Sequence, residues 1–188
     1  MPETLVINES NARREGIWLV VNKIDHDGDV RCDGNLKVLG ECIVGGNQVV
    51  GGNQVVRGNQ DVRGYQDVRG YQDVRGYLCV RGMLTWDKLT PPKCNELIVV
   101  GGIVPADYQK DYWAARLNVS LAGCYEKIIA DLTPLLPKFL ARTDLAPIER
   151  MILESHLPEN KALARQRADE LAKEREAANQ PAKQGSAP

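Results

Sequence analysis

The chain has little of several features that usually reveal a protein's class. Among its 188 residues, phenylalanine occurs once and histidine twice. No apolar run approaches the roughly 18 residues that a membrane span requires, and the start lacks the basic and apolar segments of a signal peptide. The five cysteines are odd in number and include no Cys-x-x-Cys pair. We therefore expect reduced cysteines in a cytoplasmic protein, with no zinc site and no membrane span.

An excess of one charge sign is also missing. Lysine and arginine number 24 against 25 aspartates and glutamates, for a formal net charge of -1. This balance does not favour nucleic acid or an anionic membrane as the partner of the whole surface. The hydrophobic content of 43% is ordinary for a globular protein, so the chain has enough apolar residues for a core.

The sequence does contain a repeat of six residues, in which valine and glycine each recur in strict phase. A six-residue period does not match the helical repeat of 3.6 residues, but it holds three alternations of an extended strand. We predict short strands, with a glycine wherever the chain turns. The valines are Val38, Val44, Val50, Val56, Val62, Val68, Val74 and Val80, and the glycines run in steps of six from Gly28 to Gly82.

Such units close on themselves as a triangular β-solenoid, with about 18 residues in each coil and coils about 4.8 Å apart. Each valine and the residue two before it then point to the same side. That second position is glutamine in five successive units: Gln48, Gln54, Gln60, Gln66 and Gln72. If these amides face inward, they must satisfy one another as a ladder; otherwise the cross-section must open to water. We favour the ladder.

The segment Gly34-Asn35-Leu36-Lys37-Val38 and the units that follow it resemble the repeats of bactofilins, which are polymer-forming solenoids. The resemblance covers residues 28–84 and implies a cytoplasmic, filament-forming protein without a nucleotide cofactor. The repeat is also similar to those of trimeric phage and secretion spikes, so a single-chain coil and an intertwined trimer both stay open. The short solenoid and the long region after it depart from the pattern of a filament.

The fold class that we predict is mainly β with a C-terminal α region. Its parts are an N-terminal arm over residues 1–16, a solenoid over 17–105, a helical region over 106–157, and an exposed helix with a flexible tail over 158–188. A loop with Pro91-Pro92 is expected to leave the solenoid near residues 85–96, after which Ile98 and Val100 resume the repeat.

The helical region shows the spacing of apolar residues that is typical of amphipathic helices. Tyr125, Ile128 and Ile129 predict one helix, Thr133-Pro134 begins a second, and Pro147–Ser155 forms a third that Pro158 ends. We expect Asn160 to cap the last helix. Its apolar stripe, mostly alanine with Leu163 and Leu171, is too thin for a core, so we expect the helix to be exposed or to pair with a partner.

The outward positions of the repeat carry arginine and tyrosine, which are enriched in binding hot spots. We predict them as the partner-binding residues: Arg57, Arg63, Arg69, Arg75, Arg81, Tyr65, Tyr71 and Tyr77. The plainer interpretation is a solvated surface of alternating charge, because Asp61, Asp67 and Asp73 lie between the arginines. Residues 28–84 contain seven basic and six acidic residues. This near balance of charge does not favour a nucleic-acid partner for this stretch.

Enzymatic function is not indicated. The solenoid with C-terminal helices is similar in architecture to hexapeptide-repeat acyltransferases, whose catalytic histidine lies in or beside the coils. Here His26 and His156 both lie outside the valine-marked units, and two histidines do not suffice for the three-histidine zinc site of solenoid carbonic anhydrases. The acidic segment 25–29 lacks the full calcium-loop pattern. We predict no catalytic residues, no cofactor and no metal.

The function that follows is a non-enzymatic interaction or self-assembly (scaffold) protein whose partner is another protein or a second copy of itself. One alternative is an inhibitor or adaptor from a phage or mobile element that blocks a larger host complex. The other is a hexapeptide-type acyltransferase.

Overall fold

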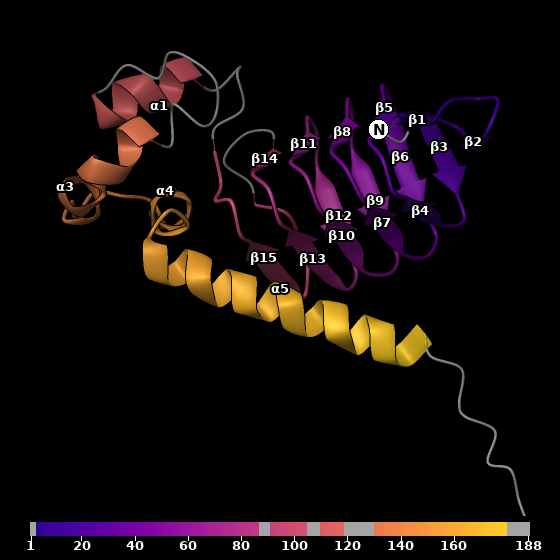
Figure 1. Ribbon diagram of the computed structural model, residues 1–188. Helices are drawn as coiled ribbons and strands as arrows, with labels where there is room; N and C mark the ends of the chain where they lie inside the picture. The colour runs from indigo at the N-terminus through magenta and orange to yellow at the C-terminus, as the bar shows by residue number, and fades with distance from the viewer. Residues whose placement is uncertain (1–2, 87–90, 105–109, 119–129, 180–188) are drawn as a thin grey trace, which may run out of the picture.

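The computed structural model describes residues 3–86, 91–104, 110–118 and 130–179. Its N-terminal part is a β-solenoid of three sheets, and the helices follow it (Figure 1). Sheet A contains β1 (Leu5–Val6), β5 (Val30–Cys32), β8 (Gln48–Val50), β11 (Gln66–Val68) and β14 (Leu84–Trp86). Sheet B contains β2 (Arg13–Glu15), β3 (Trp18–Val21), β6 (Asn35–Val38), β9 (Gln54–Val56) and β12 (Gln72–Val74). Sheet C contains β4 (Ile24–His26), β7 (Cys42–Val44), β10 (Gln60–Val62), β13 (Tyr77–Val80) and β15 (Glu96–Val99).

The strands of successive coils pair in parallel, and within the repeat each residue lies beside the residue 18 positions earlier in the sequence. Gln66 of β11 lies beside Gln48 of β8, and Gln72 of β12 lies beside Gln54 of β9. Each coil therefore adds one strand to each of the three sheets, which confirms the predicted triangular solenoid.

The interior of the tube is filled by the two inward positions of the repeat. The repeat valines are at most 1% exposed, and the five glutamines at most 2%. The glutamines bond to one another across and along the tube: Nε2 of Gln66 donates to Oε1 of Gln48 (2.9 Å) and of Gln54 (3.1 Å). Nε2 of Gln72 donates to Oε1 of Gln54 (3.1 Å) and of Gln60 (3.2 Å). The glutamines are buried and hydrogen-bonded to one another as the predicted ladder, so the open cross-section is wrong, although Nε2 of Gln54 and Oε1 of Gln66 and Gln72 have no partner among the described residues.

The glycines have a different role from the predicted one. Among the described residues, positive φ occurs only at Gly16, Gly102 and Asn118, so the repeat glycines have ordinary backbone angles. A Cβ at Gly82, however, would lie 2.5 Å from the carbonyl carbon of Gly64 one coil earlier. The corners stack backbone on backbone, and glycine is needed there for space rather than for a turn.

The predicted N-terminal arm is part of the solenoid. β1 pairs with β5 in parallel, and β2 pairs with β3 as an antiparallel hairpin. Between them, Ile7 is 4% exposed and Ala12 is partly buried, and both pack against the main core. The described part of residues 1–16, which we predicted as an N-terminal arm, thus adds strands to sheets A and B.

Both ends of the predicted loop near residues 85–96 belong to the solenoid. Strand β14 extends to Trp86, and Lys93 forms a parallel bridge to Asp73 of β12. The next strand is shifted by one residue, because Val80 pairs with Val99. Ile98 and Val100 consequently face outward, which corrects their predicted inward phase; Leu97 and Val99 pack on the interior instead.

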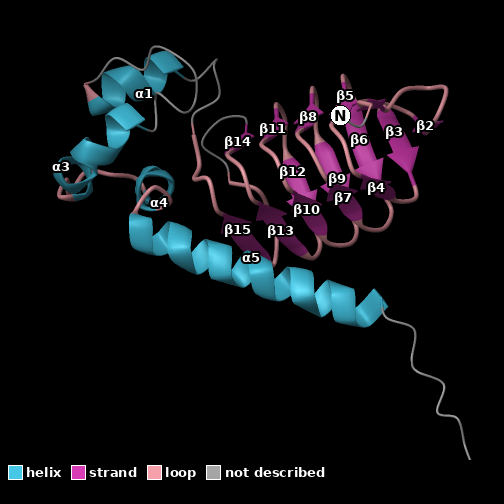
Figure 2. Ribbon diagram, in the orientation of Figure 1, coloured by secondary structure: helices cyan, strands magenta, loops and turns pink. Residues whose placement is uncertain are grey.

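The helical segments that the structure describes after the solenoid are α1 (Lys110–Leu117), the 3-10 helix η2 (Thr133–Leu135), α3 (Leu136–Leu140), α4 (Pro147–Glu154) and α5 (Pro158–Asn179). Figure 2 shows α1, α3, α4 and α5. Pro158 begins α5 instead of ending α4. Asn160 lies inside α5 and donates its side-chain amide to the carbonyl oxygen of Glu154 (2.9 Å), the last residue of α4, instead of capping the start of the last helix. The helix predicted from Tyr125, Ile128 and Ile129 lies outside the described residues. Within the described ranges, no helix is both long and apolar enough to cross a membrane.

We predicted that the last helix is exposed or pairs with a partner. One side of α5 is instead buried against the chain's own solenoid. It lies against sheet C, where Ala168 is 1% exposed and Leu171 is 6% exposed. Figures 1 and 2 show α5 following the tube from its C-terminal end toward its N-terminal end.

Candidate partner-binding faces of the solenoid

The eight predicted binding residues are distributed over the three corners of the tube, because each Arg-Gly-Tyr unit forms one corner. The corner between sheets A and B has Arg69 and Tyr71; that between B and C has Arg57, Arg75 and Tyr77; that between C and A has Arg63, Arg81 and Tyr65. The structure therefore does not bring them together in one patch. A flat partner can contact only the residues that border one sheet.

Two of the eight residues are engaged by the chain itself. Arg81 donates to a carboxylate oxygen of Asp169 (2.7 Å) and to the carbonyl oxygen of Ala168 (3.0 Å) in α5. Tyr77 packs against the small apolar cluster under the same helix. The hydrogen bond to Asp169 raises the pKa of Arg81, so this guanidinium stays charged.

Helix α5 covers the outer surface of sheet C. Ala168 and Leu171 contact a cluster formed by Cys79, Ile98 and Val100. Two ion pairs flank this contact: Arg167 with Glu96 (2.8 Å) and Arg175 with Asp61 (2.8 Å). The second pair is largely buried, with 19% and 8% of the side chains exposed.

The sequence carries a signal for this covered face. Asp61, Asp67 and Asp73 hold three successive outward positions, whereas Cys79, Ile98 and Val100 after them are all apolar and buried. A run of apolar outward residues in the last coils indicates that another element packs there. Asp61, which also points outward from sheet C, pairs with Arg175 of the helix.

The outer surface of sheet A is open. It holds a shallow hollow of about 620 Å³ lined by Arg31, Asp33, Val49, Gly51, Tyr65, Asp67 and Arg69. Tyr65 and Arg69 border it from two different corners, so this face brings together one predicted tyrosine and one predicted arginine. Burial and the carboxylate of Asp67 raise the pKa of Tyr65, which keeps its hydroxyl protonated as a hydrogen-bond donor.

Side chains of the same hollow are fixed by polar contacts. Arg31 donates to Asp33 (2.7 Å), and Thr85 donates its hydroxyl proton to Asp67 (2.8 Å). Arg69 is exposed at the rim. The hollow thus combines preformed acidic groups, one aromatic ring and one free-standing guanidinium, a mixture that suits a polar protein surface.

Val55 of β9 and Asp73 of β12, two outward residues of sheet B, are partly exposed. At its edge toward sheet C, Arg57 and Arg75 are stacked in neighbouring coils and exposed. At the other edge, Tyr71 is 47% exposed.

The two histidines have structural contacts at opposite ends of the molecule. Nε2 of His26 lies 2.8 Å from the carbonyl oxygen of Glu3, and Nε2 of His156 lies 2.7 Å from that of Ile103. Burial lowers the pKa of His156 to about 4, so its ring is neutral. Next to it, the hydroxyl of Ser155 accepts the amide proton of Ile103 (2.9 Å). These contacts join the last coil to the helical region.

Cysteines and acidic residues do not form a metal or nucleophile site in the ranges that the structure describes. No group of three His, Cys, Asp or Glu side chains is close enough to hold a metal ion there. Cys32, Cys42, Cys79 and Cys94 are free thiols. Burial raises the pKa of Cys42 and of Cys79 to about 12, which suppresses the reactive thiolate.

No protein-family model, no curated protein and no solved structure matches this chain. The assignment of a function therefore depends on the geometry of the open faces.

Proposed function

We propose that the protein is a non-enzymatic interaction protein that presents the sheet A face to a protein partner. The observation that supports this most directly is the contrast between the sheets. Sheet C is covered by α5, whereas the hollow on sheet A stays open with Tyr65 and Arg69 at its borders. Buried tyrosine and arginine anchors commonly dominate the affinity of protein interfaces.

The interior of the solenoid supports a scaffold rather than a catalyst. Valine and glutamine side chains fill the tube, and the two histidines are bonded to backbone carbonyl oxygens of Glu3 and Ile103. A scaffold needs a rigid body with a fixed outer surface, and stacked coils provide one. This is the reason to prefer it over a hexapeptide-type transferase.

The ends of the tube favour a discrete complex over the filaments suggested by the resemblance to bactofilins. At the C-terminal end, Ser155 and His156 attach the helical region to Ile103, which belongs to the last coil and bridges to Leu84. At the other end, β2 folds back antiparallel on β3. An inhibitor that blocks a larger complex would use the same sheet A face, and identification of the partner distinguishes it from a scaffold.

The experiment is site-specific photocrosslinking. A photoreactive residue replaces Val49 in the hollow, or Val55 on sheet B as the matched control. We expect Val49 to capture a protein that mass spectrometry identifies and that binds again when purified. Arg69→Glu combined with Tyr65→Ala should abolish this binding. Arg57→Glu combined with Arg75→Glu, at the opposite corner, should leave it unchanged.

Circular dichroism of each variant checks that the β-rich fold is kept. Equal loss of binding in both double variants, or capture from Val55 alone, would exclude the sheet A face. Binding of acetyl-coenzyme A in a calorimeter would instead favour the transferase.

A further inference from the structure

The N-terminal end of the solenoid is stepped. The first full coil consists of β3, β4 and β5; sheet A then continues to β1, and sheet B continues to β2. In the part of the chain that the structure describes, sheet C has no such addition and ends at β4. One strand position beyond β4 is therefore bordered by β1 and β2 and filled by neither.

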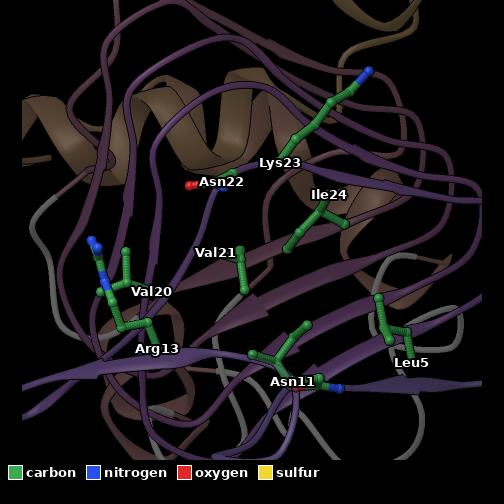
Figure 3. Close-up of a pocket in the computed structure, with 9 residues that line it drawn as sticks. Leu5, Asn11, Arg13, Val20, Val21, Asn22, Lys23 and Ile24 are labelled. Atoms are coloured by element: carbon green, nitrogen blue, oxygen red, sulfur yellow. The ribbon is translucent and has the colours of Figure 1, made fainter.

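A pocket of about 550 Å³ marks this position. Its lining consists of Leu5, Ile7, Asn11, Arg13, Val20, Val21, Asn22, Lys23 and Ile24. Figure 3 shows Leu5 from β1 and Arg13 from β2 on opposite sides of the pocket, with Val21 and Ile24 between them. The pocket thus lies between β1 and β2, next to Ile24 at the start of β4.

The edge of β4 has backbone groups suited to pairing. The amide of Ile24 donates to the carbonyl oxygen of Glu41 (3.1 Å), and the carbonyl oxygen of His26 accepts from Gly45 (2.7 Å). Both residues thus face β7. Because alternate residues of a strand bond to opposite sides, the N–H and C=O of Asp25 point away from β7, toward the strand position beyond β4. An edge of this kind pairs readily with an added strand.

The lining defines the chemistry of that strand. Leu5, Ile7 and Ile24 form an apolar inner wall, which suits apolar side chains at every second residue. The charged members of the lining are Arg13 and Lys23, and none of the nine described lining residues is acidic. Their carboxylate partners, Glu15 (2.5 Å) and Asp25 (3.0 Å), lie outside the lining. The pocket is therefore complementary to acidic side chains.

A second copy of the chain does not fit this position end to end. Sheets A and B each project one strand beyond β4, so an approaching tube would contact β1 and β2 first. A single extended segment, in contrast, can enter between them.

We propose that the edge of β4 is a strand-addition site for an extended segment of a partner protein in which apolar residues alternate and acidic residues flank them. This site is separate from the sheet A face, so it adds a second point of attachment to the proposed function.

The test uses a labelled peptide, acetyl-Glu-Val-Thr-Val-Glu-amide, and the same peptide with lysine in place of glutamate. Fluorescence anisotropy should show that the acidic peptide binds the full chain at least about tenfold more tightly than the basic one. Hydrogen exchange at Asp25 should slow when the acidic peptide binds.

The decisive variants are Asp25→Pro and its matched control Asp25→Ala. Proline is tolerated on an edge strand when its missing N–H faces outward, and it removes the donor that the added strand needs. We expect Asp25→Pro to weaken the acidic peptide at least about tenfold and Asp25→Ala by less than about threefold. Arg13→Glu combined with Lys23→Glu should reverse the charge preference.

Equal affinities of Asp25→Pro and Asp25→Ala, or no difference between the two peptides, would overturn the proposal. So would tighter peptide binding after removal of residues 180–188, because the chain's own end would then be the occupant. A dimer in sedimentation that Asp25→Pro abolishes would assign the edge to a second copy. Arg69→Glu should leave peptide binding intact and Asp25→Pro should leave capture from Val49 intact, which separates the failure of this site from the failure of the sheet A face.

Discussion

The residue type at many positions of this tube is determined by the residues that lie beside it in the neighbouring coil. The side chain of Asn53 accepts the amide of Tyr71 (2.8 Å), and the side chain of Asn35 accepts that of Asn53 (2.8 Å). The asparagine column thus serves the backbone of the following coil, and it stops where tyrosine takes its place. The glutamine column does the same for the interior, where each amide depends on its neighbours.

Gln60 provides a test of this dependence. It donates to Gln48 (2.5 Å) and accepts from Gln72 (3.2 Å). Gln60→Ala leaves a cavity and removes both bonds, so we expect the free energy of unfolding to fall by about 2–4 kcal/mol. Gln60→Leu keeps the volume, and Gln48 and Gln72 each retain another glutamine partner, so its cost should be less than about 1.5 kcal/mol. Urea unfolding measures both; equal costs would mean that the ladder contributes through hydrogen bonds alone.

The corner glycines give a second test, with a matched pair. A Cβ at Gly82 would lie 2.5 Å from the backbone of Gly64, whereas a Cβ at Gly34 meets nothing within 4 Å. We expect Gly82→Ala to lower the free energy of unfolding by about 1–3 kcal/mol. Gly34→Ala should be neutral or stabilise by about 0.5 kcal/mol, because it restricts the unfolded chain. Thermal melting curves compare the two, and a similar loss in both would show that space at the corner is not the reason for glycine.

At the scale of elements, α5 is held by a narrow contact that combines small apolar residues with ion pairs. Leu171 is 6% exposed against sheet C, while Leu163 on the same helix is 64% exposed. The helix therefore has one buried side even though its apolar stripe is short.

These two leucines are a matched pair for testing the docked helix. Leu171→Ala should destabilise the molecule by about 2–3 kcal/mol and speed hydrogen exchange in α5, because buried leucine contacts are lost. Leu163→Ala should change stability by less than about 0.5 kcal/mol. If both variants leave exchange in α5 unchanged, the helix is held by its ion pairs and not by apolar packing.

The junction between the last coil and the helices should depend on pH through His156. Burial lowers its folded pKa to about 4, whereas the unfolded chain takes up the proton near pH 6.5. The unfolded state then binds more protons between these values, so stability falls as pH drops from about 6.5 to 4, by up to about 3 kcal/mol.

His156→Gln should remove this part of the pH dependence, and His26→Gln should keep it. Urea midpoints of the three proteins at several pH values measure the effect, since carboxylate contributions cancel in the comparison. An unchanged slope in His156→Gln would assign the pH dependence to other groups.

The repeating part of the structure could be predicted from the sequence, whereas the contacts of the non-repeating segments could not. Six-residue phase alone predicted the tube, the inward valines and the glutamine ladder, because each coil meets a near-copy of itself. The shift at Val99 and the docking of α5 escaped prediction, since they depend on contacts between segments of unlike sequence, such as Asp61 with Arg175. The predicted binding residues were correctly placed on the outside, but the division of the eight among three corners follows only from the closed triangle.

At the scale of the whole molecule, coils and helix are coupled on one side only. Arg167 pairs with Glu96 of β15 and Arg175 pairs with Asp61 of β10, so the ion pairs that hold α5 reach from β15 to β10 of sheet C.

Removal of one coil tests this arrangement. Deleting residues 33–50 removes β6, β7 and β8 and leaves Asp61 in place, so α5 should stay protected from hydrogen exchange. Deleting residues 51–68 removes Asp61, and exchange in the last turns of α5 should rise at least about tenfold because Arg175 loses its partner. Both proteins should keep β-rich circular dichroism, since each coil contacts mainly its neighbours. Equal protection of α5 in the two proteins would contradict the assignment.

The helix on sheet C also limits where the solenoid can gain further coils. A helical turn advances about 5.4 Å and a coil about 4.8 Å, so Ala168, Leu171 and Arg175 meet the tube at nearly matching intervals. A coil inserted beneath the helix would displace every later contact by close to one turn, which requires about three additional helical residues. Tandem duplication therefore leaves the contacts of α5 in place only when it occurs in the coils nearest the N-terminus. We expect the number of coils to vary only there.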